Sequence, residues 1–199
     1  AFAVLAVLAY QILGPQQRPA LLRYNGGQIE VSSGSEAEGS ELQPGSVIET
    51  KTGGDALFSL DGDRVQVYMA SNTGMRIEND DRVRSLRGGM YVAVRSNSGY
   101  FGVETPGGTI NVTGTNFAVR VMPDRTEVFL ANGEIKFDHN GSTYKIEPDE
   151  IITISGADSR PSVRNVKDSA PQWVSDLYAG YQVAYKKSYF PSAGVDRRK

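Results

Sequence analysis

The chain has 199 residues, with 21 lysines and arginines against 23 aspartates and glutamates, and a formal net charge of −2. This length is enough for one sizeable domain with a short appendage. The slightly acidic balance provides no basic surface for nucleic acid, so no nucleic-acid partner is expected. The chain has no cysteine, which excludes disulfides, thiolate metal sites and cysteine nucleophiles.

The first predicted element is an apolar run at residues 1–13, which read AFAVLAVLAYQIL and are followed by a Gly-Pro pair that ends any helix. Thirteen helical residues span about 20 Å, less than the ~30 Å hydrocarbon core of a bilayer. A signal-peptide segment and a buried core helix are therefore alternatives. We expect residues 1–14 to be the end of a longer transmembrane anchor whose residues 1–13 contact lipid, since no small-residue cleavage site is evident and the run ends with interface-type residues.

Residues 28–156 show the pattern of an all-β domain, after a linker predicted at residues 15–27. Short alternating or β-branched runs are separated by Gly, Asp and Asn at intervals of roughly 8–12 residues, which is typical of an antiparallel sandwich or roll of many short strands. The pairs Asn132-Gly133 and Asn140-Gly141 predict tight hairpins, because both residues accept a positive φ. The predicted strands cover residues 28–31, 47–50, 56–60, 65–68, 74–78, 82–86, 90–95, 100–104, 109–112, 116–121, 126–130, 134–138, 143–146 and 150–154.

The C-terminal part is predicted to contain a polar connector at residues 157–168, an amphipathic helix at 169–190 and a basic tail at 191–199. Aromatic and apolar side chains recur along the helix at three- and four-residue spacing. The helix either packs on its own β domain or presents a second aromatic face to a partner or to the membrane interface, because aromatic rings are frequent anchors at protein interfaces. The candidate partner-binding residues are Trp173, Leu177, Tyr178, Tyr181, Tyr185, Tyr189 and Phe190.

The sequence singles out no catalytic, cofactor-binding or metal site. The single histidine, His139, precedes a turn pair and is interpreted as a turn residue rather than a base or a ligand. The acidic segments 61–63 and 79–81 offer oxygen atoms to Ca²⁺, but they lack the spacing of an EF-hand and are interpreted as turns. A carboxylate-dependent hydrolase is the least favoured class, because nothing singles out a pair of carboxylates. We therefore expect a non-enzymatic protein without cofactor or small-molecule substrate.

The densest motif lies at residues 103–121, which read VETPGGTINVTGTNFAVRV. This pattern predicts a strand, a Pro-Gly turn, a second strand, a kink at a Gly-Thr pair and a third strand. Alternation places one set of apolar side chains on one face of the predicted sheet. The predicted core residues are Ile110, Val112, Phe117, Val119 and Val121.

This motif resembles the hallmark of the FecR domain family. Four further segments resemble other blocks of that family in the same order, and the resemblance covers about residues 26–155. These segments are GSVIET at 45–50, ALFSLDGDRV at 56–65, NTGMRI at 72–77 and TEVFLANGEI at 126–135.

The resemblance implies a periplasmic domain that follows a single transmembrane helix in the bacterial inner membrane. In the best-known members, it relays the state of an outer-membrane receptor to a sigma factor. This sequence shows neither the cytoplasmic anti-sigma segment nor a second, secretin-like domain. We therefore expect an accessory or structural subunit that contacts other subunits of a larger membrane complex, with a FecR-type regulator of a sigma factor as the alternative.

Overall fold

A computed structural model describes residues 18–96, 99–156 and 159–191 of the chain. The expected transmembrane anchor at 1–14 and the expected basic tail beyond residue 191 lie outside these residues. Among the helices of the described residues, none is long and apolar enough to cross a membrane.

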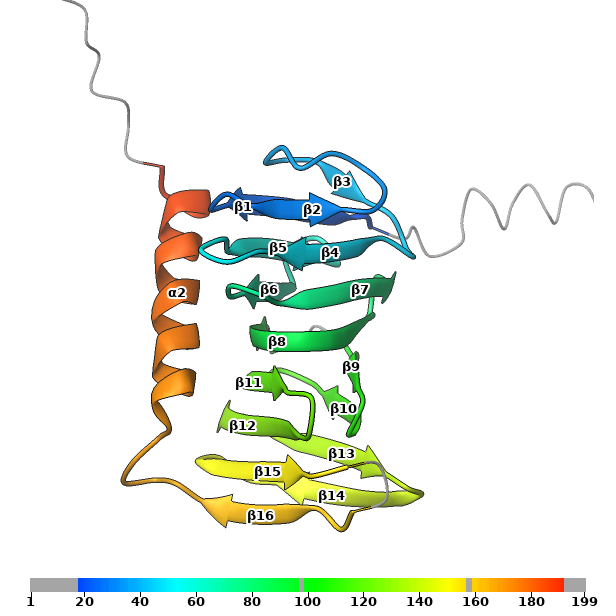
Figure 1. The fold of residues 1–199 in the computed structure, drawn as a ribbon, viewed down its shortest axis with the longest axis vertical. Coiled ribbons are helices and arrows are strands. Elements are labelled where there is room, and N and C mark those ends of the chain that lie inside the picture. The colour runs from blue at the N-terminus through cyan, green and yellow to red at the C-terminus, as the bar shows by residue number, and fades with distance from the viewer. Residues whose placement is uncertain (1–17, 97–98, 157–158, 192–199) are drawn as a thin grey trace, which may run out of the picture.

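The described residues form two β-sheets packed face to face, with one long helix against the outside of the first sheet (Figure 1). Within these residues, every strand pair is antiparallel except β8 with β9. Sheet A contains β1 (Ala20–Asn25), β3 (Glu41–Leu42), β5 (Ala56–Leu60), β6 (Val65–Met69), β11 (Asn116–Val121), β12 (Thr126–Asn132), β15 (Glu150–Ile154), β16 (Ser162–Asn165) and the second half of β8 (Arg82–Val94). Sheet B contains β2 (Ile29–Val31), β4 (Val47–Thr50), β7 (Gly74–Asn79), β9 (Phe101–Thr105), β10 (Gly108–Val112), β13 (Ile135–His139), β14 (Ser142–Ile146) and the first half of β8.

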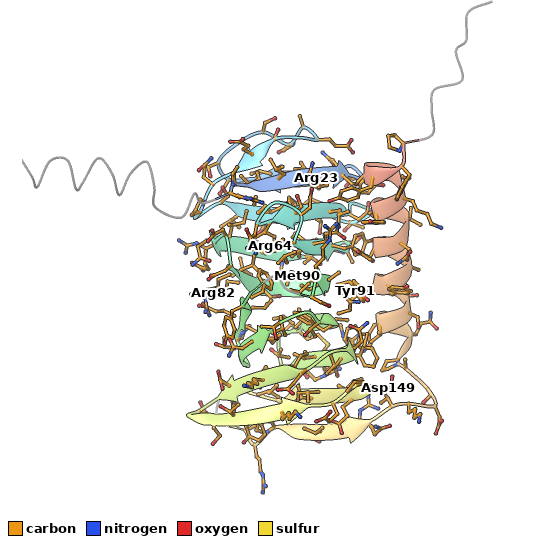
Figure 2. The ribbon with its side chains drawn as sticks, turned by 180° about the vertical axis from the view of Figure 1, so that it is seen from behind. Arg23, Arg64, Arg82, Met90, Tyr91 and Asp149 are labelled. Atoms are coloured by element: carbon orange, nitrogen blue, oxygen red, sulfur yellow. The ribbon has the colours of Figure 1, made fainter. Side chains whose placement is uncertain are left out.

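The expectation of a β-rich domain of many short strands followed by a C-terminal helix is confirmed. The main core lies between the two sheets and contains four of the five core residues predicted from the 103–121 motif, and the fifth, Val121, is buried as well. Strand geometry explains this placement, because alternate side chains of a strand point to opposite faces of its sheet. In β8, Met90 joins the core between the sheets, whereas the next residue, Tyr91, faces the helix (Figure 2).

Strand β8 belongs to both sheets, which the sequence did not predict. The sequence predicts two separate strands at 82–86 and 90–95, with the Gly88-Gly89 pair as the turn between them. In the structure one strand of 13 residues runs through this point. It pairs with β7 up to Arg87 and with β11 from Gly88 onward. Gly88 has a φ of 82°, so the chain bends here from sheet B into sheet A without interrupting its pairing.

Two segments expected to be irregular contain strands. The linker predicted at 15–27 includes β1, whose Leu22 is fully buried and pairs with Phe58 of β5. The connector predicted at 157–168 includes β16, an edge strand on β15 whose four residues are all exposed. The sequence hides the two strands for different reasons. In β1 the apolar residues Ala20, Leu21 and Leu22 are consecutive rather than alternating with polar ones, and in β16 no side chain is buried.

The two Asn-Gly pairs behave differently. Asn140 and Gly141 have φ values of 47° and 74° and join β13 to β14 in a two-residue hairpin, as predicted. Gly133 also has a positive φ, but β12 lies in sheet A and β13 in sheet B, so the hairpin predicted at Asn132-Gly133 is wrong. A Cβ atom on Gly133 would lie 2.7 Å from Oγ1 of Thr115. Glycine is needed here for a corner between the sheets.

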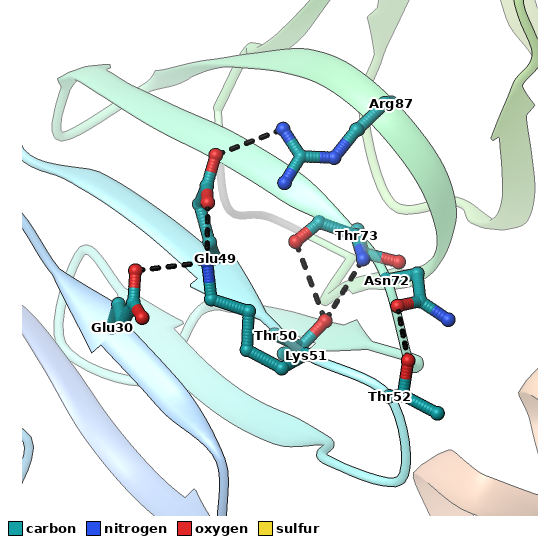
Figure 3. Close-up of polar contacts among 8 residues, drawn as sticks. All are labelled: Glu30, Glu49, Thr50, Lys51, Thr52, Asn72, Thr73 and Arg87. Atoms are coloured by element: carbon teal, nitrogen blue, oxygen red, sulfur yellow. Dashed lines mark hydrogen bonds and ion pairs between the residues drawn. The ribbon is translucent and has the colours of Figure 1, made fainter.

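At the corners where the chain changes sheet, hydroxyls of buried threonines form hydrogen bonds with backbone N–H and carbonyl groups (Figure 3). The hydroxyl of Thr73 donates to the carbonyl oxygen of Gly89 at 3.1 Å and accepts the Gly89 N–H at 3.0 Å. The Thr73 N–H in turn donates to the hydroxyl of Thr50 at 2.9 Å. At another corner, the hydroxyl of Thr115 donates to the carbonyl oxygen of Glu134 at 3.1 Å. These bonds matter because an unsatisfied buried backbone group costs about 1–3 kcal/mol.

A network of charged side chains lies beside the corner formed by Thr50 and Thr73, on the outer face of sheet B (Figure 3). Lys51 lies 2.8 Å from Glu30 and 2.9 Å from Glu49, and Glu49 lies 2.8 Å from Arg87. The hydrogen bonds from Arg87 and Lys51 lower the pKa of Glu49 from 4.5 to about 2. This network of ion pairs connects β2, β4 and β8 on this face of the sheet.

Replacing Phe117 by alanine should lower the free energy of unfolding by about 3–5 kcal/mol, because the ring is fully buried between the sheets. Urea unfolding followed by circular dichroism measures this change. Tyr100→Ala is the control, since this ring is 51% exposed. A loss below about 1 kcal/mol for Phe117→Ala would contradict the register of β11.

Glu49→Gln should be less stable than the parent at neutral pH but equally stable in strong acid. Because the folded-state pKa of Glu49 is lowered, its contribution is present above pH 4.5 and disappears as the pH falls toward about 2. Unfolding free energies at a series of pH values between these limits test this. Glu36→Gln, at an exposed carboxylate, is the matched control. A gap between parent and Glu49→Gln that persists at pH 2 would refute the prediction.

Candidate protein-interaction surface

Helix α2 (Gln172–Tyr189) crosses the outer face of sheet A from β11 to β1 (Figure 1). It begins three residues later than predicted, with Pro171 as its N-cap and no side-chain cap. Proline suits the start of a helix because it has no N–H to satisfy and its φ is already helical. The helix ends with Phe190 as its C-cap, and its last turn lies next to the C-terminal end of β1 (Figure 1).

One face of α2 is buried against sheet A. Its buried residues are Val174, Leu177, Tyr181 and Ala184, and they pack on Leu57, Tyr68, Tyr91, Ala118, Phe129, Ile151 and Val166. These contacts form a second apolar cluster that is separate from the core between the sheets. This face of α2 therefore packs on its own β domain, which is the first of the two alternatives that the sequence left open.

A close approach of helix and sheet at Gly180 had not been predicted. A Cβ atom at this position would lie 2.2 Å from the hydroxyl oxygen of Tyr68. No side chain fits there without displacing the ring. A glycine in the middle of an otherwise regular helix costs about 1 kcal/mol relative to alanine, and it was the available sequence signal for this contact.

Polar contacts fix the helix along its length. Tyr181 donates to Oε1 of Gln66 at 2.6 Å, and its ring lies 4.9 Å from the ring of Tyr91. Burial, together with the neighbouring hydroxyls of Tyr185 and Tyr178, raises the pKa of Tyr181 to about 12. Burial likewise raises the pKa of Tyr91 to about 12. Both hydroxyls therefore remain protonated at physiological pH.

The C-terminal end of the helix is held by Asp63, which lies in the turn between β5 and β6. This carboxylate accepts a hydrogen bond from Tyr189 at 2.7 Å and three from Arg23 of β1. Burial opposes ionisation of Asp63, but the hydrogen bonds from Tyr189, Ser59 and Arg23 outweigh it and leave the pKa below its ordinary value. Lys187 adds a contact to β1 by donating to the hydroxyl of Tyr24 at 3.1 Å.

The N-terminal end is held by a cation–π contact, in which the guanidinium of Arg120 lies 4.7 Å from the centre of the Trp173 ring. Arg120 is itself paired with Glu127 at 2.7 Å. The same ring therefore cannot offer this face to a partner while α2 is docked.

The structure divides the seven candidate partner-binding residues into three groups. Leu177 and Tyr181 are buried against sheet A, whereas Trp173, Tyr185 and Tyr189 are partly buried. Tyr178 and Phe190 remain exposed, at 48% and 69%. Val183 is 52% exposed and was missed, because valine is not an interface-enriched type and carried no signal of its own. A partner-binding role for these residues stays a prediction.

Two grooves flank the helix. The groove with a volume of about 500 Å³ is named the tyrosine groove, and the groove of about 570 Å³ on the other side is named the tryptophan groove. The tyrosine groove is lined by Gln66, Tyr91, Ala93, Val94, Arg95, Ser96, Gly114, Asn116, Asn132, Tyr178, Tyr181, Gln182 and Tyr185. The tryptophan groove is lined by Gly53, Gly54, Asp55, Tyr68, Ala70, Ser71, Gly89, Arg120, Trp173, Asp176 and Leu177.

The acidic turn at 61–63 and the histidine have structural partners. Asp61 is ion-paired with Arg64, and Asp63 is bound as described above. His139 is buried at the end of β13, with its ring nitrogens 2.7 Å from the carbonyl oxygen of Gly107 and 2.9 Å from that of Ser159. Its position next to a turn was predicted, but its burial was not. Within the described ranges, no group of three His, Cys, Asp or Glu side chains could hold a metal ion.

Gly180→Ala should destabilise the protein although alanine is the better helix former. The added methyl group collides with Tyr68, and overpacking of this kind costs about 1–3 kcal/mol. Thermal unfolding followed by circular dichroism measures the change. Ser175→Ala, at an exposed position of the same helix, is the control and should be neutral or stabilising. Equal or higher stability of Gly180→Ala would contradict the docking distance.

The chain is similar to a known protein family and to solved structures of related fold. Residues 46–136 match the family model described as FecR protein. Two crystal structures of a "putative anti-sigma factor" from Parabacteroides distasonis ATCC 8503, at 1.65 Å and 2.50 Å resolution, have TM-scores of 0.52 and 0.53 and are 21% identical to this chain. Each comparison covers 60% of this chain and 59% of the other, so the chain spans about three fifths of their length.

No curated protein matches the chain. At 21% identity, the two crystal structures establish a shared fold and no more. The family match rests on the segment that carries the motifs read from the sequence. Residues 46–136 of this chain therefore match the FecR family model, in agreement with the resemblance of their motifs.

Proposed function

We propose that this chain is the extracytoplasmic part of a FecR-type signalling regulator, which transmits the state of an outer-membrane receptor to a sigma factor. The observation that carries the proposal is the match of residues 46–136 to the FecR family. The fold shared with a protein described as an anti-sigma factor supports it. Both favour the regulator over the accessory subunit expected from the sequence, for which no comparison gives support.

In this proposal the chain is single-pass in the bacterial inner membrane, with the β domain in the periplasm and residues 1–14 as the anchor. The described chain begins at residue 18, just before β1, and this is also the end of the molecule reached by the last turn of α2 (Figure 1). Six residues, 14–19, lie between the apolar run and β1, and they extend at most about 20 Å. This end of the two sheets would therefore face the membrane.

The proposed role is non-enzymatic and depends on protein partners. Exposed side chains of α2, namely Tyr178, Val183 and Phe190, offer the contact surface. A rigid domain suits such a role, since it keeps a fixed surface at a fixed distance from its anchor. The polar and apolar contacts that hold α2 provide that rigidity.

Anchoring is tested by fractionation. The full chain should be recovered with membranes, whereas a chain that begins at Gln16 should be recovered in the soluble fraction without detergent. Recovery of the full chain in the soluble periplasmic fraction would refute the anchor and favour cleavage of the first residues.

Signalling is tested by deleting the gene and comparing transcripts with those of the parent strain. A regulator should change a small set of promoters that depend on one sigma factor, and the intact gene should restore them. Phe190→Asp, which changes an exposed side chain, should abolish induction without loss of protein. Val163→Asp, on the exposed edge strand β16, is the matched control. Unchanged transcripts together with stable co-purification of a membrane complex would support the accessory subunit instead.

A further inference from the structure

We propose that the tyrosine groove binds a proline-rich segment of another protein in the polyproline II conformation, with two prolines three residues apart against Tyr178 and Tyr185. This inference goes beyond the signalling proposal and does not depend on it, because binding is measured on the chain itself. It assigns an occupant to the groove between α2 and the corner of sheet A.

The spacing of the rings is the first argument. Tyr178 and Tyr185 are seven residues apart on α2, so they lie on the same side of the helix at a separation of about 10.5 Å along its axis. Residues i and i+3 of a polyproline II helix also share a side and are about 9.3 Å apart. A P-x-x-P segment that runs along α2 would therefore bring one proline to each ring.

The shape of the groove between these rings is the second argument. The ring of Tyr181 lies 6.5 Å from that of Tyr178 and 5.8 Å from that of Tyr185, and it is buried, so it forms the floor between them. The ring of Tyr91 continues this floor at 4.9 Å from Tyr181. Proline-rich segments dock on grooves of this kind because aromatic walls accept the flat pyrrolidine rings.

The polar lining is the third argument. A polyproline II segment has no internal hydrogen bonds, so its carbonyl oxygens need external donors. The side chain of Asn132 accepts the Asn116 N–H through its oxygen at 3.1 Å, which leaves its amide NH₂ as a donor. Asn116 and Gln182 bring two more amides to the groove, and the hydroxyl of Tyr91, whose pKa is raised by burial to about 12, is a further protonated donor.

The charge of the groove narrows the choice of occupant. Among the lining residues that the structure describes, Arg95 is the one charged side chain. A strongly charged peptide would therefore find at most one opposite charge in the groove, whereas a neutral and stiff segment would contact aromatic rings and amide donors. Stiffness also helps binding, because a polyproline II helix is already ordered before it docks.

The test uses the full chain in detergent micelles and fluorescein-labelled decaproline, with anisotropy as the readout. We expect saturable binding with a dissociation constant in the micromolar range, and a loss of about tenfold or more for Tyr178→Ala or Tyr185→Ala. Val183→Ala, which lies on the same helix outside the groove, should bind within twofold of the parent. Unchanged circular dichroism of the Tyr178 variant excludes unfolding as the cause of its loss, since this ring is 48% exposed.

Two competitors distinguish the occupants. An unlabelled Gly-Ser decapeptide tests for unspecific peptide binding, and a tetramer of N-acetylglucosamine tests for a neutral glycan, which would also use rings and amides. Displacement by unlabelled decaproline alone supports the proposal. Equal displacement by the Gly-Ser peptide, preferential binding of the glycan, no saturable binding of decaproline, or equal affinity of Tyr178→Ala and parent would each overturn it.

Discussion

The fold depends on the point where β8 passes from one sheet to the other. At this point the hydroxyl of Thr73 satisfies both the N–H and the carbonyl oxygen of Gly89, while Gly88 supplies the backbone bend. A Cβ atom on Gly88 would lie 2.4 Å from the Thr73 hydroxyl oxygen, so the bend and the hydrogen bonds require each other. Because β8 pairs with β7 in one sheet and with β6 and β11 in the other, the relative position of the sheets follows from this contact.

Local pattern predicted most of the strands but not the path of the chain between sheets. The 103–121 motif was placed correctly because its alternation reports a buried face, and all five of its predicted core residues are buried. Gly88 and Gly133 were interpreted as turns because a glycine that closes a hairpin and one that turns a corner look alike in sequence. The difference depends on which strands pair, and pairing is a long-range property. The edge strand β16 was not predicted for another reason, because it buries none of its side chains and so shows no apolar alternation.

The seven candidate residues of the helix were predicted to bind partners because they are aromatic or apolar. In the structure such side chains serve both to pack the helix on its own sheet and to face solvent. Leu177 and Tyr181 hold α2 to its own sheet, whereas Tyr178 and Phe190 face solvent. Sequence periodicity could separate these faces only in part, because tyrosine suits both a buried polar contact and a wet interface. Gly180 is the position in the sequence that distinguishes the two faces. It marks the side of the helix on which the sheet comes closest.

The position of the two chain ends gives the domain a mechanical direction. The described chain begins just before β1, and α2 ends beside the other end of the same strand (Figure 1). A force applied between a fixed N-terminus and a partner holding the end of α2 would therefore load the last helical turn first. The bonds from Tyr189 to Asp63 and from Lys187 to Tyr24 would carry this load before the rest of the helix does. A partner that held β16 at the opposite end would instead stretch the whole sandwich and shear α2 along its length.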